Sequence, residues 1–414
     1  IINNIGALAT LRGENAPRKG IEQGYVNILH NGTIAANGEK IIYVGTGDLP
    51  EGISIADDAV IIDAGGKLVT PGLIDSHTHL VHGGSREYEL SMKLKGAKYL
   101  DILNAGGGIY STMKATREMS LYELYNQSRK SLDIMLSYGT TTVESKSGYG
   151  IEDFDTEIKQ LQTVAKLNTQ HAVDVIPTFM GAHAIPLKYK DDPEKFVSEL
   201  IEKMIPEIGR KSLAKFCDVF CEEGVFTIDQ SRRILLAARN HGMMLKIHAD
   251  EIESLGGAEL SAELKCISAD HLVGASDEGI RLMAREGVIA NLLPGTSFNL
   301  QSGKHARARF MIDNNLPIAI STDYNPGSCP TENLQLVMSM ASIILRMTPE
   351  EVLTATTINA ACVLGLESEI GSIQVGKKAD IAIFDVKNLE YMIYHFGINH
   401  TDTVIKAGRV VYKA

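Results

Sequence analysis

The stretch PGLIDSHTHLVHGG, residues 71–84, ends an apolar run with His77, His79 and His82. Residues two positions apart in a β-strand point to the same side, so His77 and His79 would present their imidazoles together, whereas a helix would separate them. Two imidazoles at the end of a strand make half of a metal site. His82 lies three positions further on, beyond the expected end of the strand, and we expect it to have a structural role.

Three other strand-like runs end in residues that could complete this site. KIHADE brings His248, ADHL brings His271 and STDYNPG brings Asp323. Three imidazoles and a carboxylate suit Zn²⁺ or Fe²⁺ and leave a position for water. A single histidine at a strand end is more often just a hydrogen-bonded polar residue, but several at equivalent ends favour a metal site. The histidines expected to have no such role are His30, His171, His241, His305, His395 and His400.

The middle of the chain contains eight short apolar runs that have the character of β-strands. They cover residues 73–79, 140–146, 173–179, 216–223, 245–251, 267–273, 288–295 and 318–324. Segments with helical spacing of apolar residues, such as 120–139 and 277–287, lie between them. This alternation predicts an α/β protein with a TIM (β/α)₈ barrel, whose active site would lie at the C-terminal ends of the strands. A doubly wound open sheet is the alternative, but the Gly-rich GGG at 106–108 follows a helical segment rather than an early strand.

The two ends of the chain have a different pattern. Residues 19–66 and 368–414 are rich in short alternating strands separated by Asn-Gly, Ala-Gly and Val-Gly. Neither piece is long enough to bury one face of a sheet well by itself. We therefore expect residues 1–66 and 366–414 to form one composite β-sandwich domain, with the barrel, residues 67–365, inserted between its halves.

Composition excludes several classes of partner. The net charge of −11 argues against binding to nucleic acid or to an acidic membrane, although one local Arg could still hold a small anionic substrate. No run approaches the ~18 apolar residues of a membrane span, and the first residues lack a signal-peptide pattern, so we expect a cytoplasmic location. The five scattered cysteines suggest reduced thiols, and Cys217 and Cys221 are expected to be small buried side chains rather than metal ligands.

Longer motifs give a family resemblance over nearly the whole chain. PGLIDSHTHLVHGG, NAACVLG and GSIQVGKKADIAIFD resemble the amidohydrolase superfamily, whose members combine a metal-bearing barrel with a sandwich built from both chain ends. HLVHGGSREYE, ESKSGYG, FMGAHAIP, KIHADEIESLGGAELSAEL, SADHLVG and STDYNPGSCPTEN narrow the resemblance to one group within it. That group hydrolyses 4-imidazolone-5-propanoate to N-formimidoyl-L-glutamate in histidine degradation.

The resemblance also implies roles for individual residues. The ligands of one metal ion, Zn²⁺ or Fe²⁺/Fe³⁺, would be His77, His79, His248 and Asp323. The substrate-binding residues would be Arg86, Tyr149, His183, Glu251, Asn325, Gly327 and Ser328. Such enzymes are commonly homodimers, which we also expect here.

The expected chemistry can be argued from the residues. Cleaving an amide near neutral pH needs a nucleophile stronger than water, and a metal ion can lower the pKa of bound water to about 7. Asp323 would orient that water, while Glu251 would carry a proton to the departing ring nitrogen. His271 would polarise the carbonyl, and whether Glu251 or His271 accepts the first proton stays open. Arg86 would hold the propanoate through two parallel hydrogen bonds, and Tyr149 would close over the ring.

One departure bears on the number of metal ions. Dinuclear amidohydrolases carry a carboxylated Lys at the end of strand four, but here that run ends in FCEEG, and Lys146 ends strand two. We therefore predict a single metal ion. Two alternatives remain: another mononuclear deaminase or cyclic-amide hydrolase acting on a small carboxylated heterocycle, and a non-catalytic homologue, which would be expected to lack ligands.

Overall fold

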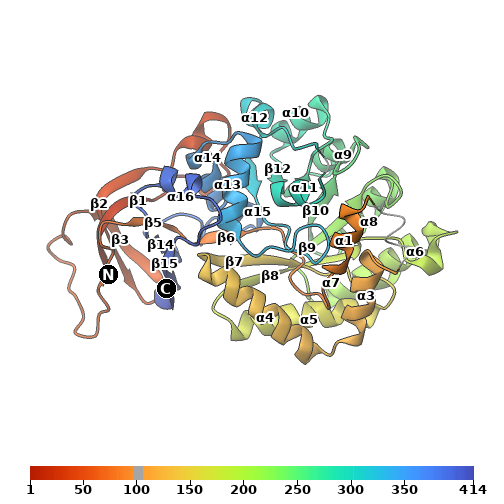
Figure 1. Ribbon diagram of the computed structural model, residues 1–414, viewed down its shortest axis with the longest axis horizontal. Helices are drawn as coiled ribbons and strands as arrows, with labels where there is room; N and C mark the ends of the chain where they lie inside the picture. Colours follow the sequence, from red (N-terminus) through yellow and green to blue (C-terminus); the bar gives the residue numbers. More distant parts are fainter. Residues whose placement is uncertain (97–105, 302) are drawn as a thin grey trace.

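The computed structural model of the protein describes residues 1–96, 106–301 and 303–414. Its larger part contains eight parallel strands in the order β13-β12-β11-β10-β9-β8-β7-β6, each of which overlaps one of the eight predicted runs (Figure 1). The strands are β6 (Leu73–Asp75), β7 (Thr140–Lys146), β8 (Asp174–Ala182), β9 (Phe216–Cys221), β10 (Met244–Ala249), β11 (Ser268–His271), β12 (Ile289–Leu292) and β13 (Ile318–Ile320). The predicted barrel is confirmed.

The first and last strands of this sheet approach each other just beyond their regular ends. A parallel bridge joins Thr78 to Tyr324. The amide of Asp323 donates to the carbonyl of His77 at 3.0 Å, and the amide of His79 donates to the carbonyl of Tyr324 at 2.8 Å. These bonds close the barrel at its C-terminal rim and fix the backbone around the predicted metal ligands.

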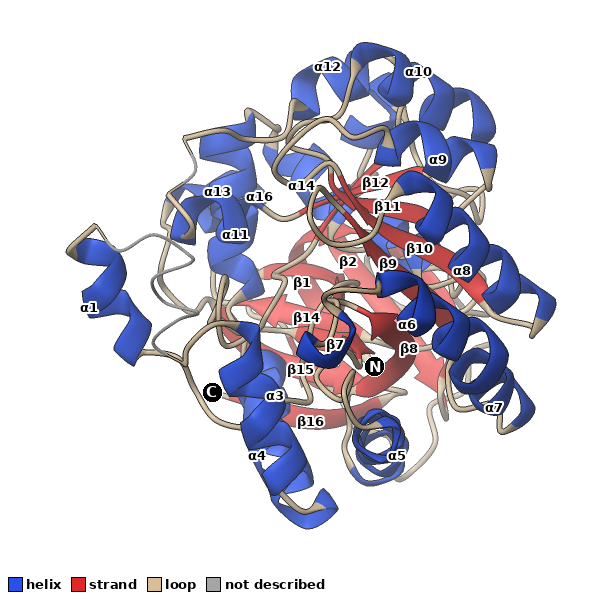
Figure 2. Cartoon of the chain, turned by 90° about the vertical axis from the view of Figure 1, so that its right-hand side faces the viewer, coloured by secondary structure: helices blue, strands red, loops and turns tan. Residues whose placement is uncertain are grey.

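Helices surround the strands (Figure 2). They are α1 (Tyr88–Leu94), α3 (Ile109–Glu118), α4 (Leu121–Ser137), α5 (Phe154–Gln170), α6 (Pro193–Glu199), α7 (Ile205–Arg210), α8 (Ile228–Asn240), α9 (Gly257–Glu263), α10 (Asp277–Glu286), α11 (Pro294–Asn299), α12 (Ala308–Asp313), α13 (Leu334–Leu345), α14 (Pro349–Ala355), α15 (Ile358–Val363) and α16 (Leu389–Tyr394), with short η1 (Gly20–Gly24), η2 (Leu187–Tyr189) and η3 (Leu200–Met204). In the described part of the chain, none of these helices has the length and apolar character that a membrane crossing requires.

Local sequence signals set the ends of the predicted helices. α4 begins with a capping box, in which the Ser120 side chain accepts from the amide of Glu123 and the Glu123 side chain accepts from the amide of Ser120. α10 ends at Gly287, whose φ of 80° lies in the left-handed region that glycine adopts at low cost. Such caps turn the chain back toward the next strand and give the short connections of a barrel.

Strands from both chain ends form a second sheet, in the order β16-β15-β14-β5-β1-β2-β3, with β4 paired to β1. They are β1 (Ile2–Ala9), β2 (Ile28–Asn37), β3 (Lys40–Thr46), β4 (Ile62–Asp63), β5 (Leu68–Pro71), β14 (Ile381–Phe384), β15 (Thr401–Lys406) and β16 (Arg409–Lys413). The halves meet where β5 pairs antiparallel with β14. The hydrogen bonding joins these strands into one connected mixed sheet, and β5 leads directly into the barrel strand β6.

Alternation along β14 shows how this terminal sheet is packed. Ile381 and Ile383 belong to a core formed within the terminal sheet, whereas Ala382 and Phe384 belong to the main core shared with the barrel. Successive side chains of a strand point to opposite faces, so one strand contributes to both cores. The terminal sheet is therefore apolar on both faces and is packed against the barrel (Figure 1).

The five cysteines are free and buried, as the sequence predicts. Cys217 and Cys221 both lie on β9 within the main core. Burial raises the pKa of each thiol, most strongly that of Cys217, which keeps both in the protonated form at neutral pH. Their surroundings are those of small buried side chains.

Candidate active site

The paired histidines lie directly beyond β6. The regular strand ends at Asp75, two residues earlier than the His-x-His pair that was expected to finish it. The reason is that the backbone from 77 to 79 bonds to the segment after β13 and to β7, where the amide of Lys146 donates to the carbonyl of Thr78. The chain stays extended there, and the imidazoles of His77 and His79 both point into the barrel mouth.

The predicted ligands come together at this mouth. Nε2 of His77 and Nε2 of His79 lie 3.4 Å and 3.6 Å from the same Asp323 oxygen, Oδ1. Ligand atoms of His77, His79 and His248 lie within 4.8 Å of one another, and so do those of His77, His271 and Asp323. One buried cluster therefore contains residues that follow β6 and β13 and residues that lie on β10 and β11. We call it the imidazole cluster, and it consists of His77, His79, His248, His271 and Asp323.

Unpartnered nitrogen atoms in the cluster fit a cation. Nε2 of His77, Nε2 of His248 and Nδ1 of His79 are buried and lack a hydrogen-bond partner. A buried polar atom without a partner is costly, by about 1–3 kcal/mol, and is uncommon in folded proteins. Imidazole nitrogens that converge with a carboxylate are the usual ligands of zinc and related ions. The cluster can thus bind a metal ion.

Charges around the cluster affect its protonation. Burial, together with neighbouring positive groups, holds the pKa of His77, His79 and His271 well below its usual value, so their rings are neutral. Burial also lowers the pKa of His248, but the Asp218 carboxylate outweighs this and leaves that pKa raised. A metal ion binding to His248 would displace a proton, which couples binding to pH.

Two buried carboxylates that the sequence analysis did not identify orient these rings. Asp270 Oδ2 lies 2.6 Å from Nδ1 of His77, and Asp218 Oδ1 lies 3.1 Å from Nδ1 of His248. When Nδ1–H donates to a carboxylate, Nε2 is left to face a metal ion. For Asp218 the available signal was a charged residue inside an otherwise apolar strand, FCDVFC.

The proposed acid–base residues lie beside the cluster. Oε2 of Glu251 is 3.7 Å from Nε2 of His271. Burial and the nearby Asp323 carboxylate raise the pKa of Glu251 to about 8, so this side chain can hold a proton at neutral pH. Burial raises the pKa of Asp323 to about 6, although the Thr296 hydroxyl, which donates to its Oδ2 at 2.6 Å, opposes that rise.

Backbone strain coincides with these residues. His271 and Asp323 have φ angles of 73° and 56°, in the left-handed region that side chains other than glycine rarely adopt. A residue held in this conformation lowers the stability of the fold by about 1–3 kcal/mol, and residues strained in this way concentrate at functional sites. Both side chains are almost fully buried, so packing holds them in this conformation.

Tyr149 and His183 form one wall of the mouth. The His183 ring stacks on His79 with centroids 4.9 Å apart, and the Tyr149 ring lies 5.5 Å from His183. Nδ1 of His183 is 3.0 Å from the carbonyl oxygen of Gly148, and burial lowers the His183 pKa to about 3. A neutral imidazole and a phenol thus border the cluster.

Arg86 lies against the loop that follows Asp323. A Cβ atom on Gly327 would be only 2.2 Å from Nη1 of Arg86, so the absence of a side chain permits this contact. Asn325 holds the loop, because its Oδ1 accepts from the amides of Gly327 and Ser328 at 2.8 Å and 2.7 Å. The predicted substrate-binding residues Asn325, Gly327 and Ser328 are therefore brought together with Arg86.

Arg86 also makes a pair that the sequence analysis did not foresee. Its Nε and Nη2 donate to the two carboxylate oxygens of Glu89 at 2.8 Å and 2.9 Å. Glu89 is buried and also accepts from the amide of Gly108 at 2.7 Å. The guanidinium is thus oriented from behind by a bidentate ion pair.

His82 is separate from these groups. Its Nδ1 is 3.0 Å from the carbonyl oxygen of His79, its ring packs near Tyr324, and burial lowers its pKa to about 4. It does not contribute to any of the candidate metal groups among the described residues. The expected structural role is consistent with this position.

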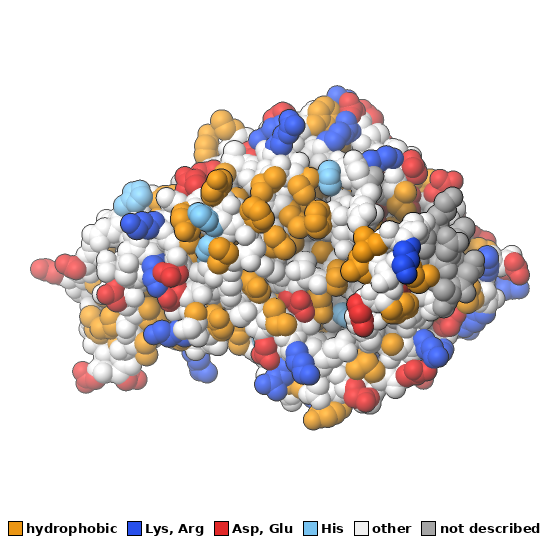
Figure 3. Space-filling view, in the orientation of Figure 1, with side chains coloured by type: hydrophobic (Ala, Val, Ile, Leu, Met, Phe, Trp, Pro, Cys, Tyr) orange, Lys and Arg blue, Asp and Glu red, His pale blue; other side chains and the backbone are white. Residues whose placement is uncertain are grey.

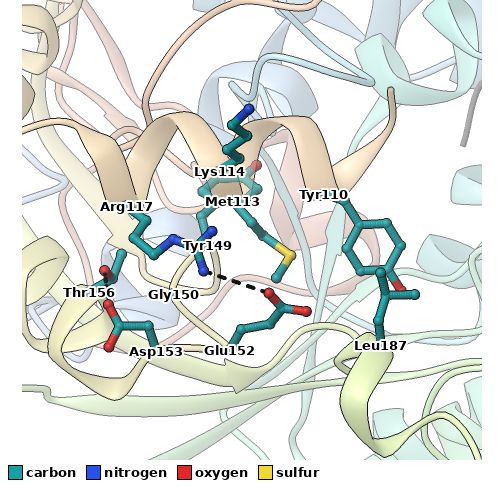
Figure 4. Close-up of a pocket in the computed structure, with 10 residues that line it drawn as sticks. All are labelled: Tyr110, Met113, Lys114, Arg117, Tyr149, Gly150, Glu152, Asp153, Thr156 and Leu187. Carbon is teal, nitrogen blue, oxygen red and sulfur yellow. Dashed lines mark hydrogen bonds and ion pairs between the residues drawn. The ribbon is translucent and has the colours of Figure 1, made fainter. Parts of the chain in front are cut away.

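A small cavity of about 80 Å³ lies against Tyr149 on the side of α3 (Figure 4). Nη1 of Arg117 lies 3.8 Å from Oε2 of Glu152 across it. Tyr149 borders both this cavity and the His79–His183 pair, so it is a wall shared by the cavity and the imidazole cluster.

Comparisons with known proteins agree with this geometry. Residues 68–411 match the model of the amidohydrolase family. The protein named imidazolonepropionase from Alkaliphilus oremlandii is 58% identical over 410 residues, covering 99% of this chain and 97% of that protein. The imidazolonepropionase from Alkaliphilus metalliredigens is 56% identical over 411 residues, with the same coverage.

Solved structures support the fold. An adenosine deaminase from Xanthomonas campestris with bound zinc has a TM-score of 0.70 at 19% identity, covering 99% of this chain and 92% of that one. The 5-methylcytosine deaminase from Klebsiella pneumoniae, liganded with 5-fluorocytosine, has a TM-score of 0.74 at 15% identity, covering 100% and 97%. The full-length identity and the family match together show that this chain belongs to the amidohydrolase family and, within it, to the imidazolonepropionases.

Proposed function

We propose that this chain, as an imidazolonepropionase, hydrolyses 4-imidazolone-5-propanoate to N-formimidoyl-L-glutamate at the imidazole cluster. The observation that carries the proposal is the convergence of the unpartnered Nε2 atoms of His77 and His248 with the Asp323 carboxylate at the barrel mouth. The motifs that surround these residues occur in a chain more than half identical to imidazolonepropionases over its full length.

One metal ion, Zn²⁺ or Fe²⁺/Fe³⁺, would be held by His77, His79, His248 and Asp323. When bound, such an ion supplies a nucleophile at neutral pH and polarises the amide carbonyl. The donor set of imidazoles and one carboxylate suits either metal. A single ion is proposed because β9, the fourth barrel strand, contains no lysine, and Lys146 on β7 is already paired with buried carboxylates.

The reaction adds one water molecule across the amide C–N bond of the ring. The water oxygen bonds to the carbonyl carbon, the electron pair of the broken C–N bond goes to the ring nitrogen, and one water proton ends on that nitrogen. Glu251 is suited to carry this proton, because its raised pKa lets it exchange a proton near neutral pH. His271 lies 3.7 Å from Glu251 and is neutral, so its ring carries one N–H group. This N–H can donate to the carbonyl oxygen of the substrate.

Residues outside the cluster would bind the rest of the substrate. The planar guanidinium of Arg86 can bind the propanoate carboxylate, with Glu89 fixing its orientation. Tyr149 and His183 would pack on the imidazolone ring, since both rings lie beside His79. The loop of Asn325, Gly327 and Ser328 would line the opposite side and exclude water.

We further propose that the protein acts as a homodimer that associates through the face of α13 and α16. A groove of about 870 Å³ there is lined by large apolar side chains that are more than half exposed, namely Ile343, Tyr394, Phe396 and Ile398. Hydrophobic side chains gather over this part of the surface (Figure 3). Exposed apolar patches of this kind are typical of protein interfaces. Analytical ultracentrifugation should give a dimer for the wild type and a monomer for Phe396→Glu.

Incubation of the metal-loaded protein with 4-imidazolone-5-propanoate tests the function directly. Proton NMR should show loss of the ring signal and stoichiometric appearance of N-formimidoyl-L-glutamate. The corresponding imidazolone without the propanoate is the matched control and should react far more slowly. Failure to open the ring with full metal occupancy would refute the proposal, whereas equal rates on both compounds would refute the role of Arg86.

A further inference from the structure

Below the imidazole cluster, the barrel interior contains five charged side chains that the reaction does not use. They come from β7, β9, β10 and β11 and have no exposed surface: Glu144, Lys146, Asp218, Lys246 and Asp270. Burying a charge is costly unless it is paired and hydrogen-bonded. A network of this size directly under a candidate metal site therefore requires an explanation.

Lys146 connects most of this network. Its Nζ lies 2.7 Å from Asp218 Oδ2, 2.9 Å from Glu144 Oε2 and 3.6 Å from Asp270 Oδ2. The two aspartates are the partners of Nδ1 of His248 and of His77. One ammonium group thus contacts both carboxylates that orient the metal-facing imidazoles.

We propose that Lys146 is a positioning residue that holds Asp218 and Asp270 together, so that Nε2 of His77 and Nε2 of His248 face the same point. Hydrogen-bond partners of metal-binding histidines fix the ring tautomer and orientation, and losing one typically reduces metal affinity about 10–100-fold. Lys146 acts on both partners at once. This inference rests on the proposed metal site and adds to it a residue with no direct contact to the ion.

Lys246 offers a matched control within the same barrel. It is equally buried and shares the partner Glu144, whose Oε1 accepts from its Nζ at 2.9 Å. Its other hydrogen bond goes to the carbonyl oxygen of Ser76 at 3.4 Å, and its ammonium lies over the Phe216 ring. Among the described residues, it forms no ion pair within 4.0 Å with Asp218 or Asp270. Replacing either lysine removes a buried cation, but only Lys146 contacts the two aspartates.

The test compares Lys146→Met with Lys246→Met in the full-length protein. Zinc affinity is measured by competition with a chromophoric chelator, and the imidazole tautomers of the metal-free protein by ¹⁵N NMR. We expect both variants to lose stability in urea. Only Lys146→Met should lose zinc affinity about 10–100-fold and show mixed tautomers at His77, whose ring is neutral. Equal zinc affinity of the two variants, or unchanged tautomers in Lys146→Met, would overturn the inference.

Lys146→Gln covers the case in which Lys146→Met does not fold. Its amide can still donate to one carboxylate, so we expect it to fold and to lose zinc affinity about tenfold, since one of the two aspartates is then released. Wild-type affinity in this variant would contradict the role of Lys146. A wild-type protein that binds no zinc or iron would instead refute the proposed metal site, which keeps the two failures distinct.

Discussion

The barrel mouth and the terminal sheet differ in the types of side chain that they bury. The terminal sheet encloses an aliphatic core that includes Ile5, Leu8, Ile381 and Ile383. The mouth instead buries imidazoles, carboxylates and ammonium groups, and strained backbone at His271 and Asp323. Aliphatic burial stabilises a fold at roughly 25 cal/mol per Å², whereas buried charges do so only when they are well paired. Stability therefore comes from the sheet and the apolar core, and the mouth is the proposed site of the chemistry.

Substitution of a histidine in the imidazole cluster should reduce activity far more than substitution of a histidine in the terminal sheet. His248→Ala removes one proposed ligand, and we expect kcat/KM to fall on the order of 10⁴-fold, about 5–6 kcal/mol of transition-state stabilisation. Metal analysis should show loss of the bound ion. His30→Ala, at an exposed position on β2 of the terminal sheet, should keep full activity and metal content. Retained activity in His248→Ala would contradict the assignment of the site.

Replacement of the proposed proton carrier should affect turnover but not metal binding. Glu251→Gln keeps the size of the side chain and removes its titration, so kcat should fall about 10²–10⁴-fold with little change in KM. Steady-state kinetics and metal analysis check both parts. Glu253→Gln, at an exposed carboxylate two residues away, should behave as wild type. If both variants lost activity equally, the local loop rather than proton transfer would be responsible.

Loss of the guanidinium should affect substrate binding. Arg86→Met is expected to raise KM about 10–100-fold, since hydrogen bonds to a charged group contribute about 1.5–3 kcal/mol each. Arg117→Met, in the neighbouring cavity of Figure 4, removes a half-exposed guanidinium and should leave KM unchanged. An unchanged KM in Arg86→Met would indicate that Arg86 serves only to hold Glu89.

The smallest expected effects come from two conservative core substitutions, which test whether a loss of stability is accompanied by a loss of activity. Ile383→Val in the terminal sheet removes one buried methylene and should lower the free energy of unfolding by about 1 kcal/mol with kcat unchanged. Ile247→Val should lower the free energy of unfolding by a similar amount. Because Ile247 lies between Lys246 and His248 on β10, this variant should also show a measurable fall in kcat. Urea unfolding and kinetics of both variants test the comparison. Equal effects on kcat would show that the two regions are not energetically separate.

The barrel could be predicted because its strands are buried on both faces and therefore appear as apolar runs. The imidazole cluster could be predicted because a parallel barrel brings all C-terminal strand ends to one rim, so His77, His248 and Asp323 had to be near one another. Resemblance to a family added residues such as His183 and Ser328, which no local pattern distinguishes.

The supporting charges could not be predicted in the same way. Asp218 is recognisable as unusual in an apolar strand, but its pairing with Lys146 depends on strand order and inward orientation, which only the folded barrel supplies. The Arg86–Glu89 pair likewise requires the chain to turn into α1 after the GG sequence. The terminal segments were expected to pack together, but which strands join the two halves could not be predicted, because the β5–β14 contact pairs residues more than 300 positions apart.

Metal titration of the metal-free protein tests the central claim most directly. Zinc or ferrous iron is added stepwise, and bound metal and the rate of opening of 4-imidazolone-5-propanoate are measured on the same samples. We predict that activity rises in proportion to bound metal and reaches its maximum at one ion per chain. Full activity in the metal-free protein, or a maximum reached only at two ions per chain, would contradict the account.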